Sequence, residues 1–221
     1  ACEASDIIFI GPTAEIISNL GNKVIARRIM AEAGIPMVPG TPNLPQGREG
    51  ISLALDFAHE YGYPIMLKAT SGNTVHLGTR DCSIQRRNQK LIEIAPSMIR
   101  DKALLDEICD TAVHAARAAK YLNAGTVEFL IDKDYNYYFM EINTRVQVEH
   151  TVTEMITGID IVRNQINIAF GKPLSFTQED VKIRGHAIEV RINAEDPKND
   201  FMPEGGKTVS VYRSTGGFGV R

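Results

Sequence analysis

Two glutamates that face each other across a short turn carry the clearest chemistry in this sequence. The polar turn 133–136 separates two strand-like segments. If the turn is centred between Asp134 and Tyr135, Glu128 lies directly across from Glu141, with Cβ atoms about 4.5–5.5 Å apart. Like charges in such a pair are destabilising, and no neighbour in the sequence neutralises them. The pair therefore predicts a bound cation.

Asn143 and Arg145 follow Glu141 at two-residue steps, so an extended chain places all three side chains on one face. Two carboxylates and an amide oxygen are hard ligands that suit Mg²⁺ or Mn²⁺. A metal beside a fixed guanidinium is typical of phosphoryl transfer. In the alternative interpretation both glutamates point to solvent, and a one-residue slip of register would send one of them to the other face.

The elements that must position these residues alternate between strands and helices without an internal repeat, which indicates an α+β (mixed α/β) protein. Apolar spacing predicts helices at 14–33, 51–61, 101–121 and 159–170. Short apolar or alternating runs predict strands at 7–10, 63–69, 74–77, 126–131, 137–142, 186–193 and 208–212. We expect the strand 7–10 to be buried.

Composition excludes several classes of protein. The formal net charge of −3 gives no reason to expect a nucleic-acid or acidic-membrane partner. The basic run 80–90 has no aromatic residue to stack on a base, so it suits a small anion better. Three scattered cysteines predict neither a disulfide framework nor a metal site. Without a membrane-spanning run or a signal peptide, we expect a cytoplasmic protein. A start without Met predicts a fragment.

Several long strings carry a resemblance to a known family. They are Met140–His150, Thr153–Gly158, Arg184–Pro197, Phe9–Pro12, Arg80–Arg87 and Gly216–Gly219. Together they resemble the signature of biotin carboxylases, the ATP-grasp component of acetyl-CoA, propionyl-CoA and pyruvate carboxylases. The resemblance implies an ATP-grasp fold with its lid subdomain largely missing. It also implies that ATP phosphorylates bicarbonate to carboxyphosphate, whose CO₂ is transferred to biotin.

The resemblance implies roles for individual residues. Glu128, Glu141 and Asn143 would hold Mg²⁺ or Mn²⁺ at the ATP phosphates. Lys90, Arg145, Gln147 and the backbone of Val148 would bind bicarbonate. Glu149 would be the general base, and Arg191 would stabilise the biotin enolate. The remaining ATP contacts would be Lys23, Lys68, Gln85, Asn88 and Leu130. Taken singly, each lysine could equally be a solvated surface amine, and Arg191 could belong to a surface ion pair.

The chain departs from the family pattern directly after Lys68. There the family carries a glycine-rich phosphate loop and a lid, whereas this sequence reaches Thr74 within a few residues. One interpretation is a short hairpin turn between two strands. We expect instead that a disordered lid belongs at this join, because lids move. A true deletion would hold ATP weakly and leave the chain inactive. Asn88 stands where many members carry His, and can still donate a hydrogen bond.

The family also implies domains and partners. Residues 1–40 would end an N-terminal biotin carboxylase domain with its helical linker, 41–71 would begin the lid subdomain, and 72–221 would form the ATP-grasp core and the start of a C-terminal domain. Biotin would arrive on a separate carrier protein or domain, and a carboxyltransferase and a homodimer partner are expected. Two alternatives are another ATP-grasp carbon–nitrogen ligase and a non-catalytic ATP-grasp-like scaffold.

Overall fold

The computed structural model describes residues 1–37, 61–68, 73–86, 89–204 and 216–221. It divides into two compact units, Ala1–Val190 and Arg191–Arg221. Among the described residues, no helix combines the length and the apolar character needed to cross a bilayer.

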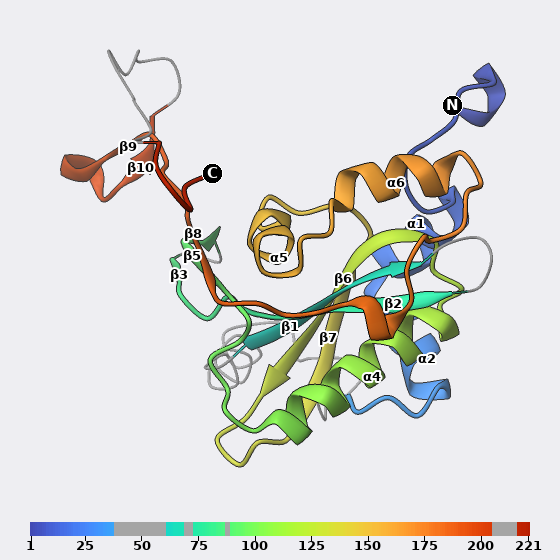
Figure 1. Ribbon diagram of the computed structural model, residues 1–221, viewed down its shortest axis with the longest axis horizontal. Helices are drawn as coiled ribbons and strands as arrows, with labels where there is room; N and C mark the ends of the chain where they lie inside the picture. The colour runs from blue at the N-terminus through green and yellow to red at the C-terminus, as the bar shows by residue number, and fades with distance from the viewer. Residues whose placement is uncertain (38–60, 69–72, 87–88, 205–215) are drawn as a thin grey trace. The chain divides into compact units, whose positions relative to one another are not determined.

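The first unit is built on a six-stranded sheet with the strand order β7-β6-β1-β2-β5-β8 (Figure 1). Every neighbouring pair is antiparallel. The strands are β1 (Tyr61–Lys68), β2 (Thr74–Asp81), β5 (Ile92–Ala95), β6 (Asn123–Ile131), β7 (Tyr137–Asn143) and β8 (Ala187–Val190). A separate antiparallel pair of two-residue strands, β3 (Gln85–Arg86) and β4 (Gln89–Lys90), precedes β5. We call this pair the β3–β4 hairpin.

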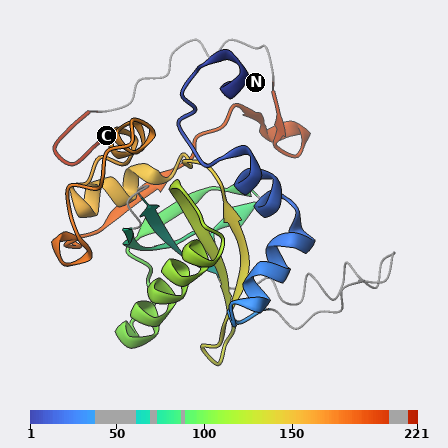
Figure 2. The same cartoon turned by 90° about the vertical axis from the view of Figure 1, so that its right-hand side faces the viewer.

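One face of the sheet packs against α1 (Ala14–Gly21), α2 (Lys23–Glu32) and α4 (Lys102–Ala118). Figure 2 shows α1 and α2 beside β7, the sheet edge that α2 contacts. The shared core includes Phe129, whose ring meets those of Tyr137 and Phe139 edge to face. Alternate residues of β6 supply this core, as expected for a strand with two buried faces.

The other face packs against α5 (His150–Thr157) and α6 (Ile161–Ala169), which lie above the sheet in Figure 1 while α4 lies below it. Val75 and Leu77 of β2 meet Ile161 and Ile168 of α6 in a second apolar cluster. A smaller apolar cluster joins Ala95 of β5 to Val152 and Ile156 of α5.

The second unit, considered by itself, contains the strand pair β9 (Glu195–Asp196) and β10 (Met202–Pro203). The 3-10 helix η3 (Pro197–Asn199) connects the two strands. The 3-10 helices η1 (Glu3–Ser5) and η2 (Gln178–Asp180) belong to the first unit.

The strand expected at 7–10 is wrong: these residues form no regular element, and Ile7 is 60% exposed. An apolar run alone cannot say whether another strand is present to pair with it. The helix expected at 14–33 is interrupted at Asn22, whose Oδ1 accepts from the backbone N of Val24 at 3.0 Å and so begins α2. The helix expected at 51–61 falls almost entirely outside the described residues, as the strand at 208–212 does completely.

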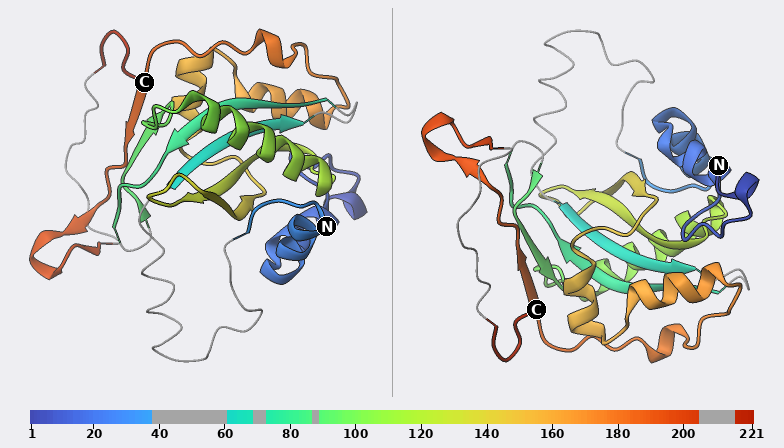
Figure 3. Two further views of the ribbon diagram at one scale, coloured as in Figure 1. Left: turned by 90° about the horizontal axis from the view of Figure 1, so that it is seen from below. Right: turned by 90° about the horizontal axis from the view of Figure 1, so that it is seen from above.

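The strands on either side of the join after Lys68 are neighbours in the sheet. Strands β1 and β2 pair antiparallel, with Lys68 opposite Thr74, and both views of Figure 3 show them side by side. Residues 69–72 themselves lie outside the described part of the chain.

Candidate metal and anion site

Glu128 and Glu141 are directly opposite each other in the β6–β7 hairpin, as predicted. The turn, however, is placed differently from the prediction. Near the turn, Ile131 pairs with Tyr137 and Phe129 with Phe139, so the hairpin is centred on Asp134. A register shift after Phe139 then adds Met140 to β7 as an extra residue. Without this bulge Glu128 would face Met140, so the bulge creates the acidic pair.

The two carboxylates converge on the side chain of Asn143. Its Nδ2 donates to Glu128 Oε1 at 2.7 Å and to Glu141 Oε1 at 3.4 Å, which places all three residues on one face of the sheet. The O and N atoms of an amide are interchanged by a half-turn of the side chain. After that turn, Oδ1 and two carboxylate oxygens would surround one point. Among the described residues, no cluster of three or more His, Cys, Asp or Glu side chains is suited to a metal.

Lys90, which belongs to β4, brings a positive charge to the acidic pair. Its Nζ lies 3.3 Å from Glu128 Oε1 and 2.9 Å from Glu149 Oε1. No near neighbour in the sequence neutralises the acidic pair, but Lys90 does so for Glu128 through the fold. This contact was not predicted, because Lys90 is 38 residues away in the sequence.

The cluster shifts the pKa values of its members in different directions. Burial raises the pKa of Glu128, and Lys90 only partly offsets this effect. Burial alone would also raise the pKa of Glu149, but the Lys90 ammonium and hydrogen bonds hold it below its usual value. Burial alone would lower the pKa of Lys90, but the surrounding acidic groups, Glu128 first, raise it. Glu149 is thus the carboxylate that stays charged most readily.

Gln147 joins this cluster to a second, fully buried pair that sequence analysis missed. Its Nε2 lies 3.4 Å from Glu128 Oε1, and its Oε1 accepts from Arg80 Nη2 at 2.9 Å. Arg80 is completely buried and pairs through Nε with Oε1 of Glu93. Burial raises the pKa of Glu93 to about 7 against the opposing effect of Arg80. The position of Arg80 in the basic run 80–90 was the only signal available.

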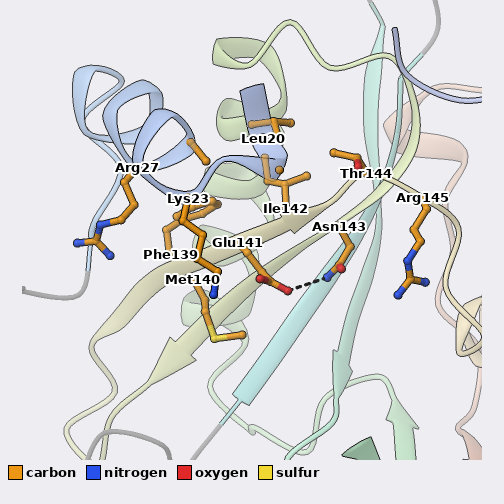
Figure 4. Close-up of a pocket in the computed structure, with 12 residues that line it drawn as sticks. Leu20, Lys23, Arg27, Phe139, Met140, Glu141, Ile142, Asn143, Thr144 and Arg145 are labelled. Atoms are coloured by element: carbon orange, nitrogen blue, oxygen red, sulfur yellow. Dashed lines mark hydrogen bonds between the residues drawn. The ribbon is translucent and has the colours of Figure 1, made fainter. Parts of the chain in front are cut away.

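A pocket of about 410 Å³ opens beside the acidic pair (Figure 4). Glu141, Asn143 and Arg145 line one side, and Lys23, the first residue of α2, lines the other. Figure 4 shows the Lys23 side chain extending to the same region as Glu141. Of the predicted nucleotide ligands whose side chains the structure describes, Lys23 lines this pocket, and Gln85 and Leu130 do not. A polar pocket with cationic and anionic walls suits a phosphate chain accompanied by a metal.

The remaining residues predicted to bind ATP, bicarbonate or biotin are spread over several segments of the chain. Arg145 is exposed and donates from Nη1 to its neighbour's carbonyl, Val146 O, at 3.2 Å. Val148 is also exposed, and Gln85 pairs with Lys90 across the β3–β4 hairpin. Leu130 pairs with Tyr61 and Tyr138 in the sheet. Arg191 is the first residue of the second unit, while Asn88 and the side chain of Lys68 lie outside the described part.

Comparison with known proteins identifies relatives over the whole chain. The family model "Carbamoyl-phosphate synthase L chain, ATP binding domain" matches residues 22–72 and 69–177. Biotin carboxylase 1 of Bacillus subtilis is 41% identical over 278 residues, covering 100% of this chain and 61% of the relative. The biotin carboxylase of a Nostoc species is 42% identical over 278 residues, again with 100% of this chain and 61% of the relative covered.

Solved structures agree with these relatives. The biotin carboxylase domain of Hydrogenobacter thermophilus 2-oxoglutarate carboxylase, in complex with MgADP, ADP and bicarbonate, matches with a TM-score of 0.82 and 37% identity. The match covers 91% of this chain and 56% of that one. The pyruvate carboxylase of Rhizobium etli matches with a TM-score of 0.88 and 41% identity, over 98% of this chain and 23% of that one.

The alignments also locate the departure after Lys68. The Bacillus subtilis alignment runs over 278 residues against the 221 residues of this chain, so the relative carries residues without a counterpart here. The two segments of the family match meet at residues 69–72. These residues follow β1 and precede β2, so the break in the family match falls where the sequence departs from the family pattern.

Proposed function

The chain belongs to the family of carbamoyl-phosphate synthase L chain ATP-binding domains, with biotin carboxylases among its relatives, and we propose that it serves ATP-dependent carboxylation of biotin. The chain spans about 61% of the length of the Bacillus subtilis relative, so this activity is proposed for the whole enzyme of which such a chain forms part. The observation that carries the proposal is the convergence of Glu128, Glu141 and Asn143 on one point beside a cationic pocket.

The acidic pair fits a divalent ion by its donor atoms. Two carboxylate oxygens approach one amide group, and hard oxygen ligands of this kind suit Mg²⁺ or Mn²⁺. When bound, such an ion would neutralise charge on the ATP phosphates. Lys23 on the opposite wall would meet a phosphate as a point charge. We propose that Lys68, Gln85, Asn88 and Leu130 complete the nucleotide site, as the resemblance implies.

The group around Lys90 suits a small anion and a proton acceptor. Lys90 and Gln147 would donate to bicarbonate, together with the fork of Arg145 and the backbone of Val148. Glu149, kept ionised by Lys90, would accept the bicarbonate proton so that the oxygen can attack the γ-phosphate of ATP. Lys90 then has two tasks, since it binds the anion and keeps the base charged.

The second half of the reaction releases CO₂ from carboxyphosphate beside N1 of biotin and gives carboxybiotin, ADP and phosphate. We propose that Arg191 stabilises the biotin enolate. Biotin would be presented by a carrier protein or domain, and a carboxyltransferase would consume carboxybiotin. Relatives named as subunits of larger carboxylases support this setting. A homodimer, the three predicted domain segments and a cytoplasmic location remain part of the proposal.

The test is ATP hydrolysis by the full chain with and without bicarbonate and free biotin. We expect ADP formation that requires bicarbonate and that rises with biotin. An ATPase stimulated by ammonia but indifferent to biotin would indicate a different ATP-grasp ligase. Calorimetry with MgADP distinguishes an enzyme from the non-catalytic scaffold. A chain that binds no nucleotide would be the scaffold. Binding without any turnover would contradict activity of this chain and leave it only a binding role.

A further inference from the structure

The buried Arg80 divides its hydrogen bonds between Glu93 and Gln147. This arrangement orients Gln147 but is not the one that would stabilise the fold most. An arginine and a carboxylate in an apolar interior usually pair through two parallel hydrogen bonds. Here Arg80 uses Nε for Glu93 and Nη2 for Gln147, at 2.9 Å from its Oε1. Among the described residues, Arg80 Nη1 and Glu93 Oε2 are buried and have no hydrogen-bond partner. Buried unsatisfied groups are costly, so this arrangement is a poor one if its only task is to hold the fold.

The contact with Arg80 determines which way the amide of Gln147 faces. A guanidinium carries only donors, so the Gln147 atom beside it must be the carbonyl oxygen. The nitrogen Nε2 must then face the opposite way, toward Glu128, Lys90 and Glu149. Its contact with Glu128 Oε1 is long, at 3.4 Å, so this N–H group can shift to a better acceptor. Gln147 is itself only 6% exposed, which confines the amide.

A bulge in β2 aims Arg80 at this face of the sheet. Met66 pairs with His76 and Pro64 with Thr79, so β2 holds one extra residue between these pairs. Gly78 lies in that interval with a φ of 84°, a backbone conformation that favours glycine. In a regular strand, Thr79 would share a face with Val75 and Leu77. The extra residue shifts the alternation of side chains between the two faces by one, so Arg80 takes that place. A regular strand would have turned Arg80 toward α4 instead.

We propose that Arg80, braced by Glu93, is a positioning residue that holds the amide of Gln147 with its nitrogen toward the bound anion. The proposal rests on the proposed function, because it takes that anion to be bicarbonate. It adds two buried residues that do not touch the substrate. It also explains why the fold keeps an ion pair with two unsatisfied atoms directly behind the anion site.

The test uses the side-chain amide resonance of Gln147 in the full ¹⁵N-labelled chain, assigned by its absence in Gln147→Leu. The variant that decides is Arg80→Met combined with Glu93→Leu, because removing both charges avoids an unpaired buried charge. We expect its melting temperature to match or exceed that of the wild type. The Gln147 amide should nevertheless lose its protection from hydrogen exchange, and the bicarbonate Kd, measured with MgADP present, should rise at least about tenfold.

A double variant that keeps the Gln147 amide protected, or a Kd within twofold of wild type, would overturn the proposal. Arg80→Lys is the conservative control: it keeps a charge for Glu93 but lacks the rigid fork, so it should also loosen the amide. If wild type binds no bicarbonate, the proposed function fails. The amide exchange then still decides the role of Arg80, because it is measured without ligand.

Discussion

At the scale of single residues, Lys90 pairs with two carboxylates, Glu128 and Glu149. The pKa values of these two carboxylates shift in opposite directions. Glu128 lies 3.3 Å from Lys90 Nζ and is buried enough for its pKa to rise. Glu149 lies closer, at 2.9 Å, and its pKa falls below its usual value. A base must be ionised at working pH, and a metal ligand can be deprotonated by the metal itself. The distances therefore match the roles assigned to the two glutamates.

Replacing Glu149 with Gln should separate chemistry from binding. The variant keeps the shape of the side chain but cannot accept a proton, so bicarbonate-dependent ATP turnover should fall at least about 100-fold. The affinity for MgADP, measured by calorimetry, should stay within about twofold because Glu149 does not face the nucleotide pocket. Glu15→Gln on the exposed side of α1 is the control. Unchanged turnover in Glu149→Gln would reject its role as the base.

Replacing Lys90 with Met should destabilise the fold in a pH-dependent way. Breaking a largely buried ion pair costs about 3–5 kcal/mol, and with Lys90 still 16% exposed we expect about 2–4 kcal/mol at neutral pH. Lys90 favours the charged forms of Glu128 and Glu149. The Glu149 part of this difference is therefore present above the ordinary glutamate pKa of 4.5 and is lost as the pH falls through the lowered pKa of Glu149. The Glu128 part is lost at higher pH, because the pKa of Glu128 is raised.

Urea unfolding at a series of pH values measures this difference. Lys133→Met is the matched control, because its partner Asp134 is exposed and the pair contributes little. A Lys90→Met effect that persists unchanged at pH 3 would show that the lysine acts through packing and not through its charge.

At the scale of elements, two bulges determine which side chains reach the site. The extra residue Met140 in β7 brings Glu141 opposite Glu128, and the extra residue near Gly78 in β2 brings Arg80 to the same face. Neither bulge leaves a signal in the hydrophobic pattern. The predicted pairing of the glutamates was right, yet it assumed a different turn and a regular ladder.

Replacing Gly78 with Ala tests the β2 bulge. The positive φ disfavours any side chain, and a Cβ would also meet Ile183 Cδ1 at 2.9 Å. We expect a loss of about 1–3 kcal/mol of unfolding free energy in urea titrations. Gly34→Ala is the control, since Gly34 has a φ of 71° with nothing within 4 Å of its Cβ position. Equal losses in both variants would mean that the bulge has no special packing requirement.

Helix α4 and the pairing of β6 with β7 were predictable from the sequence because their apolar patterns are long or bounded by a clear turn. The interruption of 14–33 at Asn22 was not, since its apolar spacing continues through the cap. Helix α5 and strand β5 were missed because each is short and follows directly on residues assigned to the site. Lys90 and Arg80 reach Glu128 and Gln147 only through tertiary structure, which local patterns do not encode.

At the scale of the whole molecule, β1 and β2 are central neighbours in the sheet, and the relatives carry residues that have no counterpart in this chain. Their alignment with this chain is longer than the chain itself, and the family match divides at residues 69–72. If the deletion at this join is real, water could reach an acyl phosphate and the chain would bind ATP weakly without turnover. Glu128, Asn143, Lys90 and Glu149 still lie together on the sheet face. Binding is accordingly the most robust property to measure.

The measurement that tests the proposed metal site most directly is Mn²⁺ binding to the full chain, followed by electron paramagnetic resonance with and without ADP. The geometry predicts one Mn²⁺ per chain, bound more tightly with ADP. The Kd should rise at least about tenfold in Glu128→Gln and in Glu141→Gln, because each removes one of two charged ligands. If both variants bind Mn²⁺ and ADP as wild type does, the two carboxylates do not form a metal site, and the proposed phosphoryl chemistry is contradicted.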